Sequence, residues 1–326
     1  MKVNAAVLIG DRGKSRPIRG ENKNFLEING LPLFFYVLQA LENSGYINQI
    51  NIVGDRNRIK KIIEKNIHFL KFPEKLVILE QGRSLFENAL IASKNVLGLE
   101  GDRIWVSNPE LEEKAILFLP GDAPLITSQE IDEFVGNCDL SRFDYFLGMS
   151  TEEFLRPFYP SKKEKGIKMA YYLVKGKKYR QSNLHLVKPL KIRNRHYIQK
   201  MYDYRYQKQF INFLRLLWAF LKAHVRMKGI YYYLTLHWNL FLSRIGLEII
   251  TPIFRRLVSI EDIEKGIGEL LGCRFTIVET KIAGAALDID NEKDYETMKV
   301  MFAKWRKYQE HVIEELSGEK IAFETA

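Results

Sequence analysis

Short continuous runs of apolar residues alternate with amphipathic stretches along most of the chain. The first run, Asn4–Ile9, is almost wholly apolar and ends at Gly10, as expected of a strand buried on both faces. Between Leu33 and Asn43 the apolar residues instead recur at helical spacing. On these patterns we expect strands at Asn4–Ile9, Phe25–Gly30 (a short strand and turn), Ile50–Gly54, Leu76–Leu79, Ala115–Pro120, Tyr145–Met149, Met169–Val174 and Leu184–Val187, and helices at Leu33–Asn43, Asn57–Lys65, Ser84–Val96 and from Thr127 or Ser128 onward. Strands and helices that alternate at this spacing predict βαβ units and a parallel sheet.

The pattern changes over residues 196–258, which are rich in aromatic residues and leucine, with lysine and arginine between them. We expect a helical insert there. Ser259–Asp262 has the pattern of a capping box, and strands are expected again at Phe275–Glu279 and Ala286–Ile289, before a final helix from about Glu292. The charged stretch 98–114 is expected to be a solvated loop.

These elements predict an α/β fold with a single Rossmann-like sheet of the GT-A type, mostly parallel and covered by helices on both faces. Residues 1–195 and 259–326 would form the core, and residues 196–258 would be inserted into it. The insert has three interpretations: a cap, a dimer interface or a membrane-surface element. Leucine and aromatic stripes at helical spacing favour the first two, whereas apolar stretches flanked by Lys222, Arg226 and Lys228 are typical of the third.

The chain of 326 residues is 46% hydrophobic and 28% charged, as in a globular protein, and it carries a formal net charge of +10. That excess suits polyanionic partners, including nucleotide phosphates, although no nucleic-acid-binding motif is present. The two cysteines and six histidines are scattered, which excludes a disulfide framework and a zinc cluster. The apolar start ends too early for a signal peptide. We therefore expect a cytoplasmic protein, or one peripheral to the inner membrane surface if the insert contacts lipid.

Candidate chemistry lies where three of the expected strands end, the edge at which open α/β sheets bind ligands. A glycine-rich basic loop, Gly10–Arg16, follows the first strand, and Lys23 comes soon after it. Glycines let the backbone approach a phosphate, and basic side chains offset its charge. The loop is not a P-loop, because Leu8 stands where that motif needs its first glycine.

Carboxylates follow the other two strand ends. Asp122 comes directly after the most apolar strand, in a position suited to Mg²⁺, which prefers oxygen ligands and shared phosphates. Asp288 and Asp290 lie at the last expected strand, and we expect at most one of them to reach the same metal as Asp122.

Together and in this order, these motifs resemble the MobA-like nucleotidyltransferase superfamily. That superfamily includes molybdenum-cofactor guanylyltransferases, sugar-phosphate uridylyltransferases and the cytidylyltransferase of isoprenoid synthesis. The resemblance covers about residues 1–190 and 259–300. Its motifs are Ala6–Gly10 with Gly13–Arg16, Lys23 with Phe25–Pro32, Glu80–Leu85, Leu119–Leu125 and Leu287–Tyr295.

The resemblance implies transfer of a nucleotide from an NTP to a phosphorylated acceptor (a sugar phosphate, an alcohol phosphate or a cofactor precursor), with release of pyrophosphate. It also implies a role for each matching residue. Arg16 and Lys23 would be catalytic, Asp122 and Asp290 would hold Mg²⁺ or Mn²⁺, Asn183 would lie near the acceptor, and the nucleotide would be bound by Gly10, Arg12, Gly13, Gly82, Ser84 and Asn88.

Two other functions stay open from the sequence. A Mg²⁺-dependent glycosyltransferase that uses a nucleotide sugar could share this sheet. Asp288-Ile289-Asp290 matches the Asp-x-Asp pattern with which such enzymes bind Mg²⁺. A catalytically weak nucleotide-binding protein at the membrane periphery is the second. It is motivated by the insert and by Asp11, which places a negative charge beside the expected triphosphate.

Overall fold

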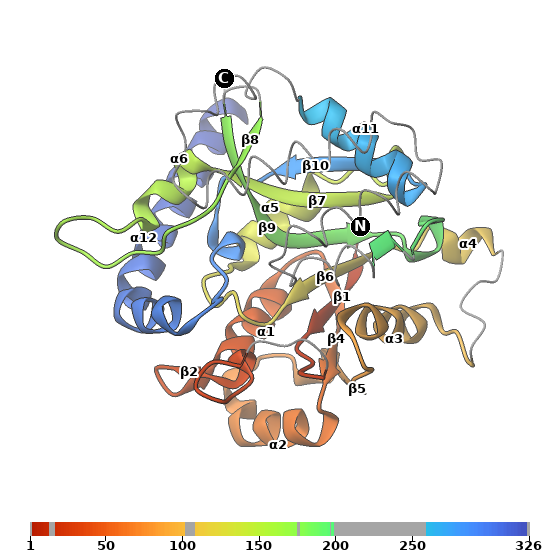
Figure 1. Ribbon diagram of the computed structural model, residues 1–326, viewed down its shortest axis with the longest axis horizontal. Helices are drawn as coiled ribbons and strands as arrows, with labels where there is room; N and C mark the ends of the chain where they lie inside the picture. The colour runs from red at the N-terminus through yellow and green to blue at the C-terminus, as the bar shows by residue number, and fades with distance from the viewer. Residues whose placement is uncertain are drawn as a thin grey trace, which may run out of the picture.

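The computed structural model describes residues 2–12, 17–101, 108–174, 177–195, 197–198 and 259–324. Across them runs one mixed sheet with the strand order β10-β7-β9-β6-β1-β4-β5, and β8 is paired to β9 (Figure 1). β9 runs antiparallel to its neighbours, while the remaining pairs along this path are parallel. The mostly parallel α/β sheet predicted from the sequence is confirmed.

The strands of this sheet are β1 (Val3–Leu8), β4 (Ile47–Gly54), β5 (Leu76–Glu80), β6 (Ile116–Pro120), β7 (Tyr145–Thr151), β8 (Tyr172–Val174), β9 (Lys177–Val187) and β10 (Phe275–Glu279). A separate hairpin consists of β2 (Glu27–Ile28) and β3 (Leu31–Pro32). The α-helices are α1 (Leu33–Asn43), α2 (Arg56–Asn66), α3 (Leu85–Leu97), α4 (Pro109–Glu112), α5 (Ser128–Gly136), α6 (Glu152–Leu155), α11 (Ile260–Leu271) and α12 (Glu292–Glu324). The 3₁₀ helices are η1 (Lys23–Phe25), η2 (Ile67–Phe69), η3 (Pro73–Lys75), η4 (Arg156–Phe158), η5 (Pro189–Lys191) and η7 (Gly284–Ala286).

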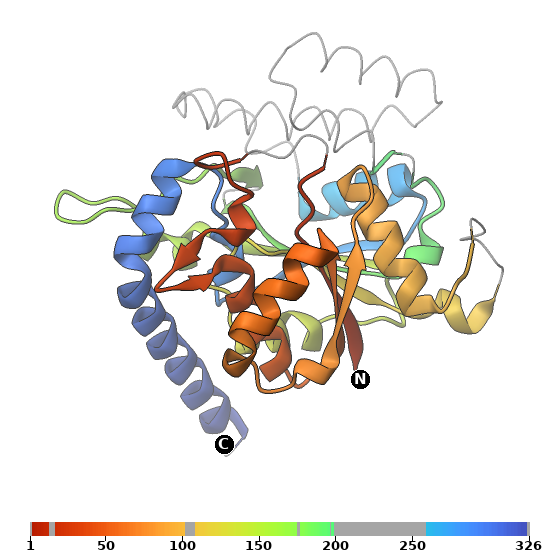
Figure 2. The same cartoon turned by 90° about the horizontal axis from the view of Figure 1, so that it is seen from below.

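Helices cover both faces of the sheet, as the continuous apolar strands predict (Figure 2). Successive side chains of β1 point to opposite faces, so Ala5 and Val7 join the core cluster that includes α1 and α5. Ala6 instead packs with Ala92 of α3 on the other face. Farther along that second face, α11 packs its Ile263 against β7 and β10.

One expected strand, Ala286–Ile289, is wrong. The chain forms the 3₁₀ turn η7 there and continues without pairing to the sheet. Side chains hold the backbone in place of a strand neighbour: Ala285 N–H donates to Oε2 of Glu130, and Arg180 and Asn183 donate to carbonyls of the same turn. Hydrophobicity alone could not reveal this, because the segment is as buried as a strand would be.

The charged stretch 98–114 is not a loop throughout. Asn108 caps the short helix α4, with its side chain accepting from the N–H groups of Glu110 and Leu111, and Pro109 occupies the first turn. Capping and proline chemistry therefore form a helical turn where hydrophobic periodicity gives no signal.

The expected helical insert lies outside the described residues apart from Tyr197 and Ile198, so its interpretations stay predictions. Among the described residues, none of the helices combines the length and apolar character that a bilayer span needs. The helix that follows the insert, α11, begins as expected: Ser259 and Asp262 form a reciprocal capping box.

Candidate active site

The candidate site lies where β1 and β6 end side by side. From β1 the strand order proceeds to β4 on one side and to β6 on the other, which makes this edge a topological switch point. Asp122 follows β6, Lys23 begins η1, and the segment after η7 passes close by, because Ile289 N–H donates to the carbonyl of Asp122 at 3.1 Å. Three segments far apart in the sequence thus meet at one point.

Lys23 is the centre of this cluster. Its ammonium forms an ion pair with Asp122, lies 3.7 Å from Asp290 Oδ1, and donates to the carbonyl of Ile289 at 2.8 Å. Burial disfavours the charged lysine, but attraction to the neighbouring aspartates outweighs it, so the pKa of Lys23 is raised. Lys23 is therefore a cation at neutral pH.

Asp122 is buried, with 3% of its surface exposed. Burial raises the pKa of this carboxyl, and the charges of Asp288 and Asp290 add to the effect, while Lys23 opposes it. Its Oδ1 atom is buried and has no hydrogen-bond partner among the described residues. A buried carboxylate oxygen without a partner is costly, so this oxygen is suited to a ligand that brings positive charge.

Asp288 and Asp290 have different environments. Asp288 is 9% exposed and accepts from Arg180 Nη2 at 2.9 Å in an ion pair, whereas the side chain of Asp290 is 58% exposed beside Lys23. The sequence prediction chose Asp290 as the second metal ligand, and the structure brings Asp290 to the Lys23–Asp122 cluster. The described residues contain no group of three metal-ligating side chains, so a metal here would need oxygens from substrate as well.

The loop after β1 is held by Gln81, the first residue after β5. Gln81 Oε1 accepts from the backbone N–H groups of Asp11 at 2.8 Å and Arg12 at 3.3 Å, and Gln81 Nε2 donates to Asp11 Oδ1 at 2.9 Å. Gly10 lies against the same amide, since a Cβ there would come within 2.8 Å of Gln81 Oε1. Asp11 is thus a partner of Gln81. The predicted site residues did not include Gln81, although it belongs to the Glu80–Leu85 motif and stands beside Gly82.

The predicted nucleotide-binding residues do not all lie together. Gly82 and Asn88 lie next to Gly10: Gly82 N–H donates to Asn88 Oδ1 at 2.7 Å, and a Cβ on Gly10 would collide with Asn88 Nδ2. Ser84 caps α3, with its hydroxyl accepting from Glu87 N–H, so its position is also explained by helix formation.

Arg12, the basic residue in the described part of the loop, pairs with a residue outside the aspartate cluster. Its guanidinium pairs with Glu80 at 2.8 Å, with both side chains about half exposed. Gly13 and Arg16 lie outside the described residues, so their predicted roles stay predictions.

Asn183 lies in β9, where the pairing of β9 with β7 shifts register, and its backbone has a φ of 58°. Its side chain donates to the carbonyl of Ala285 at 3.1 Å. Asn183 therefore supports η7 and, through it, the segment that carries Asp290. Contact with an acceptor stays a prediction.

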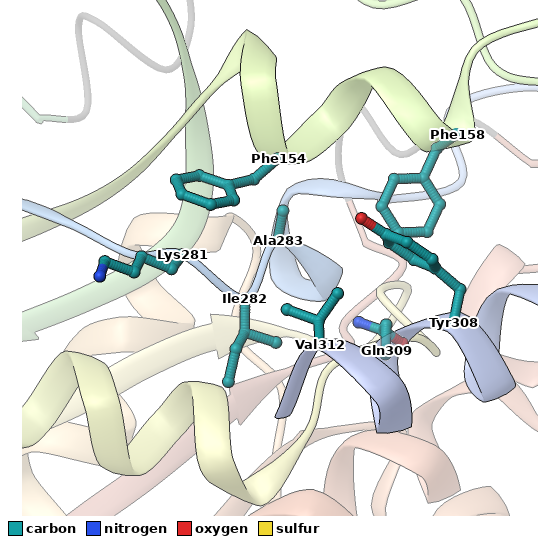
Figure 3. Close-up of a pocket in the computed structure, with 8 residues that line it drawn as sticks. All are labelled: Phe154, Phe158, Lys281, Ile282, Ala283, Tyr308, Gln309 and Val312. Carbon is teal, nitrogen blue, oxygen red and sulfur yellow. The ribbon is translucent and has the colours of Figure 1, made fainter. Parts of the chain in front are cut away.

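A separate hollow lies between α6, α12 and the segment before η7 (Figure 3). Gln309 is buried there, and neither atom of its amide has a hydrogen-bond partner among the described residues. The residues that line this hollow are Phe154, Phe158, Lys281, Ile282, Ala283, Tyr308, Gln309 and Val312. They include none of the candidate site residues, so the hollow does not belong to that site.

Residues 6–96 match the model of a cytidylyltransferase family. The matched segment starts in β1 and ends in α3, so it contains the loop at Gly10, Lys23, and the Gln81–Gly82 pair. No curated protein sequence matches the chain.

Several solved structures resemble the chain at low identity. A hypothetical transferase from Thermus thermophilus has a TM-score of 0.54 and 18% identity, covering 90% of this chain and 99% of that one. A 4-diphosphocytidyl-2C-methyl-D-erythritol synthase from Anaerococcus prevotii has a TM-score of 0.45 and 10% identity, covering 93% and 96%. A cytidylyltransferase from Leptospira borgpetersenii has a TM-score of 0.43 and 15% identity, covering 97% and 94%. At such identities only the fold is shown, and the first of the three supports it.

Proposed function

We propose that this chain is a nucleotidyltransferase that moves a nucleotide, with CTP as the preferred donor, onto a phosphorylated small molecule and releases pyrophosphate. The match of residues 6–96 to the cytidylyltransferase model supports the type of reaction and the choice of CTP. The finer likeness to the MobA-like members is part of this proposal and rests on the sequence motifs alone.

The observation that carries the proposal is the convergence of Lys23, Asp122 and Asp290 at the switch point of the sheet. Phosphoryl transfer asks the protein to align two anions and to offset the charge that develops on phosphoryl oxygens. A buried carboxylate with an unpartnered oxygen, beside a cationic lysine, would provide both a metal ligand and a phosphate ligand within one site.

In the proposed reaction an oxygen of the acceptor phosphate attacks the α-phosphorus of CTP, and the bond to the β-phosphate oxygen breaks. The backbone around Gly10 and Gly82 would face the cytosine, and Asn88 fixes the distance between these two glycines through its bond to Gly82. Lys23 would donate to oxygens of the α-phosphate as negative charge shifts towards the leaving pyrophosphate.

Asp122 and Asp290 would hold a divalent cation, Mg²⁺ or Mn²⁺. The unpartnered Oδ1 of Asp122 fits this role, as does an oxygen-only pair of ligands that leaves positions for phosphates and water. A divalent cation held by these carboxylates would supply positive charge that offsets the charge of the phosphates. The contribution of the chain is to fix Asp122, through the buried turn after β6 and the bond from Ile289 N–H to its carbonyl.

The proposal also covers residues 196–258, which would form a cap, a homodimer interface or a peripheral membrane contact. Neither a dimer nor a lipid contact is needed for the chemistry described above, since the residues named for it lie on the core.

The proposal is tested by incubating the protein with each of the four NTPs, Mg²⁺ and a mixture of phosphorylated small molecules while measuring pyrophosphate. We expect release with CTP that depends on the acceptor mixture. Turnover of a nucleotide sugar without pyrophosphate would indicate the glycosyltransferase instead. Binding of CTP without any turnover would indicate a nucleotide-binding protein.

A further inference from the structure

The Lys23 ammonium lies among the oxygens that the proposed metal would use. It pairs with Asp122, approaches Asp290 Oδ1 at 3.7 Å, and donates to the Ile289 carbonyl at 2.8 Å. Of these three oxygens, those of Asp122 and Ile289 lie within hydrogen-bond distance of the ammonium, and that of Asp290 lies within ion-pair distance. The lysine ammonium therefore lies where it offsets the negative charge of these oxygens.

A divalent cation and the ammonium cannot share this position. Both are attracted by the carboxylates of Asp122 and Asp290, and at the separation set by one carboxylate two positive charges repel each other strongly in a partly buried site. Even a metal bound to the unpartnered Oδ1 of Asp122 would lie next to an ammonium on the other oxygen of the same group.

The side chain of Lys23 can move away from the carboxylates, whereas its backbone is held in place by neighbouring hydrogen bonds. Asn22 caps η1, its Oδ1 accepting from Asn24 N–H, and Asn22 Nδ2 donates to the carbonyl of Ile9 at 2.9 Å. These bonds fix residue 23 beside the end of β1, where the phosphates of a nucleotide would lie. The four-carbon stem of lysine is flexible enough to turn the ammonium from the carboxylates to a phosphate.

We propose that Lys23 and the divalent cation exchange at the Asp122–Asp290 pair: the ammonium neutralises the carboxylates when the site is empty, and it moves to the nucleotide phosphates when metal and nucleotide enter. This inference rests on the proposed function for the identity of the nucleotide. Its consequence is cooperative binding, because metal alone must displace Lys23 without offering it a new anion, whereas metal with nucleotide supplies one.

The test measures Mn²⁺ binding without nucleotide, by the EPR signal of free Mn²⁺, in the wild type and in Lys23→Met. Methionine keeps much of the length of lysine without its charge. We expect Lys23→Met to bind Mn²⁺ at least about tenfold more tightly, since the competing cation is gone. Unchanged or weaker binding would overturn the exchange and would mean that Lys23 helps to hold the metal.

Lys178→Met is the matched control. Lys178 pairs with Glu152 at 3.0 Å, and its side chain is 22% exposed, close to the 24% of Lys23, but its ion pair is with a residue outside the proposed metal site. We expect its Mn²⁺ affinity to equal that of the wild type. An equal gain in both variants would overturn the inference, since it would reflect only the loss of one positive charge.

A second measurement uses the wild-type chain and does not depend on the stability of a variant. The rate at which an amine-specific reagent labels Lys23, followed by mass spectrometry, should rise when Mn²⁺ is added alone and fall when Mn²⁺ and CTP are added together. Labelling that Mn²⁺ leaves unchanged would contradict the exchange. Exchange without transfer of any nucleotide would leave this inference standing and remove the proposed function.

Discussion

Gly121, which joins β6 to Asp122, has no room for a side chain. A Cβ there would lie 2.9 Å from Asn24 Oδ1 and 2.9 Å from Phe34 Cβ, and would overlap Ile9 Cγ2 more closely still. These neighbours come from three different segments that are packed together, so none can move alone. Overpacking of this kind costs about 1–3 kcal/mol. For a chain of this size we expect Gly121→Ala to lower Tm by roughly 1.5–4.5 °C.

The same change should affect activity more than stability. Asp122 is the next residue, and a displacement of its carboxylate by about 1 Å is enough to lower the rate about 100-fold. The assays are a melting curve and the rate of pyrophosphate release with CTP and acceptor. Gly45→Ala is the control, because a Cβ on Gly45 meets only Asp132 Oδ2, at 3.9 Å. We expect it to stay within about 0.5 kcal/mol of the wild type. Equal Tm and equal rates for the two variants would refute the packing argument.

Three further changes test other parts of the account. Asp290→Ala should lower kcat at least about 100-fold, whereas Asp288→Ala, which breaks the ion pair with Arg180, should mainly lower Tm. Equal losses of kcat in the two variants would contradict the choice of Asp290 as the metal ligand. Burial raises the pKa of Glu130 well above its usual value, so its contribution to stability is complete below about pH 4.3 and is lost as pH rises through the folded-state pKa. Glu130→Gln cannot ionise, so the Tm of this variant relative to the wild type should rise between pH 5 and pH 9. A difference in Tm that does not change with pH would count against a protonated Glu130. The double change Trp218→Ser and Phe220→Ser, outside the described residues, should lower Tm as the loss of core or dimer contacts does, and a stable double variant that no longer binds anionic liposomes would indicate a membrane surface instead.

Local patterns were enough to predict most of the core. The helix at Leu33–Asn43 has the predicted bounds, since an apolar stripe at helical spacing begins at the end of β3 and stops before Gly45. β9 is longer than the predicted Leu184–Val187, because it begins at Lys177, in a polar stretch that pairs with β7 and β8. Alternation is weak in such a stretch, so pairing partners decide the length of this strand.

The site was predicted in outline but not in its contacts. Asp122 could be found from its place after a buried strand, and Lys23 from the order of motifs. The bond between Gln81 and the loop at Asp11 could not, because it joins residues 70 positions apart and depends on how β1 and β5 are placed. For the same reason the lysine between two carboxylates becomes visible only when three distant segments meet.

The proposed function places nucleotide transfer at the end of β6. The most direct test follows the label of CTP carrying ³²P at the α-phosphate, with Mg²⁺ and a mixture of phosphorylated acceptors, in the wild type and in Asp122→Asn. We expect the wild type to move the label into a phosphatase-resistant product, with one pyrophosphate released for each transfer. We expect Asp122→Asn, folded by circular dichroism, to form no such product. Product formation by Asp122→Asn at the wild-type rate, or no product with the wild type when CTP or any other α-labelled NTP is supplied, would contradict the proposed function.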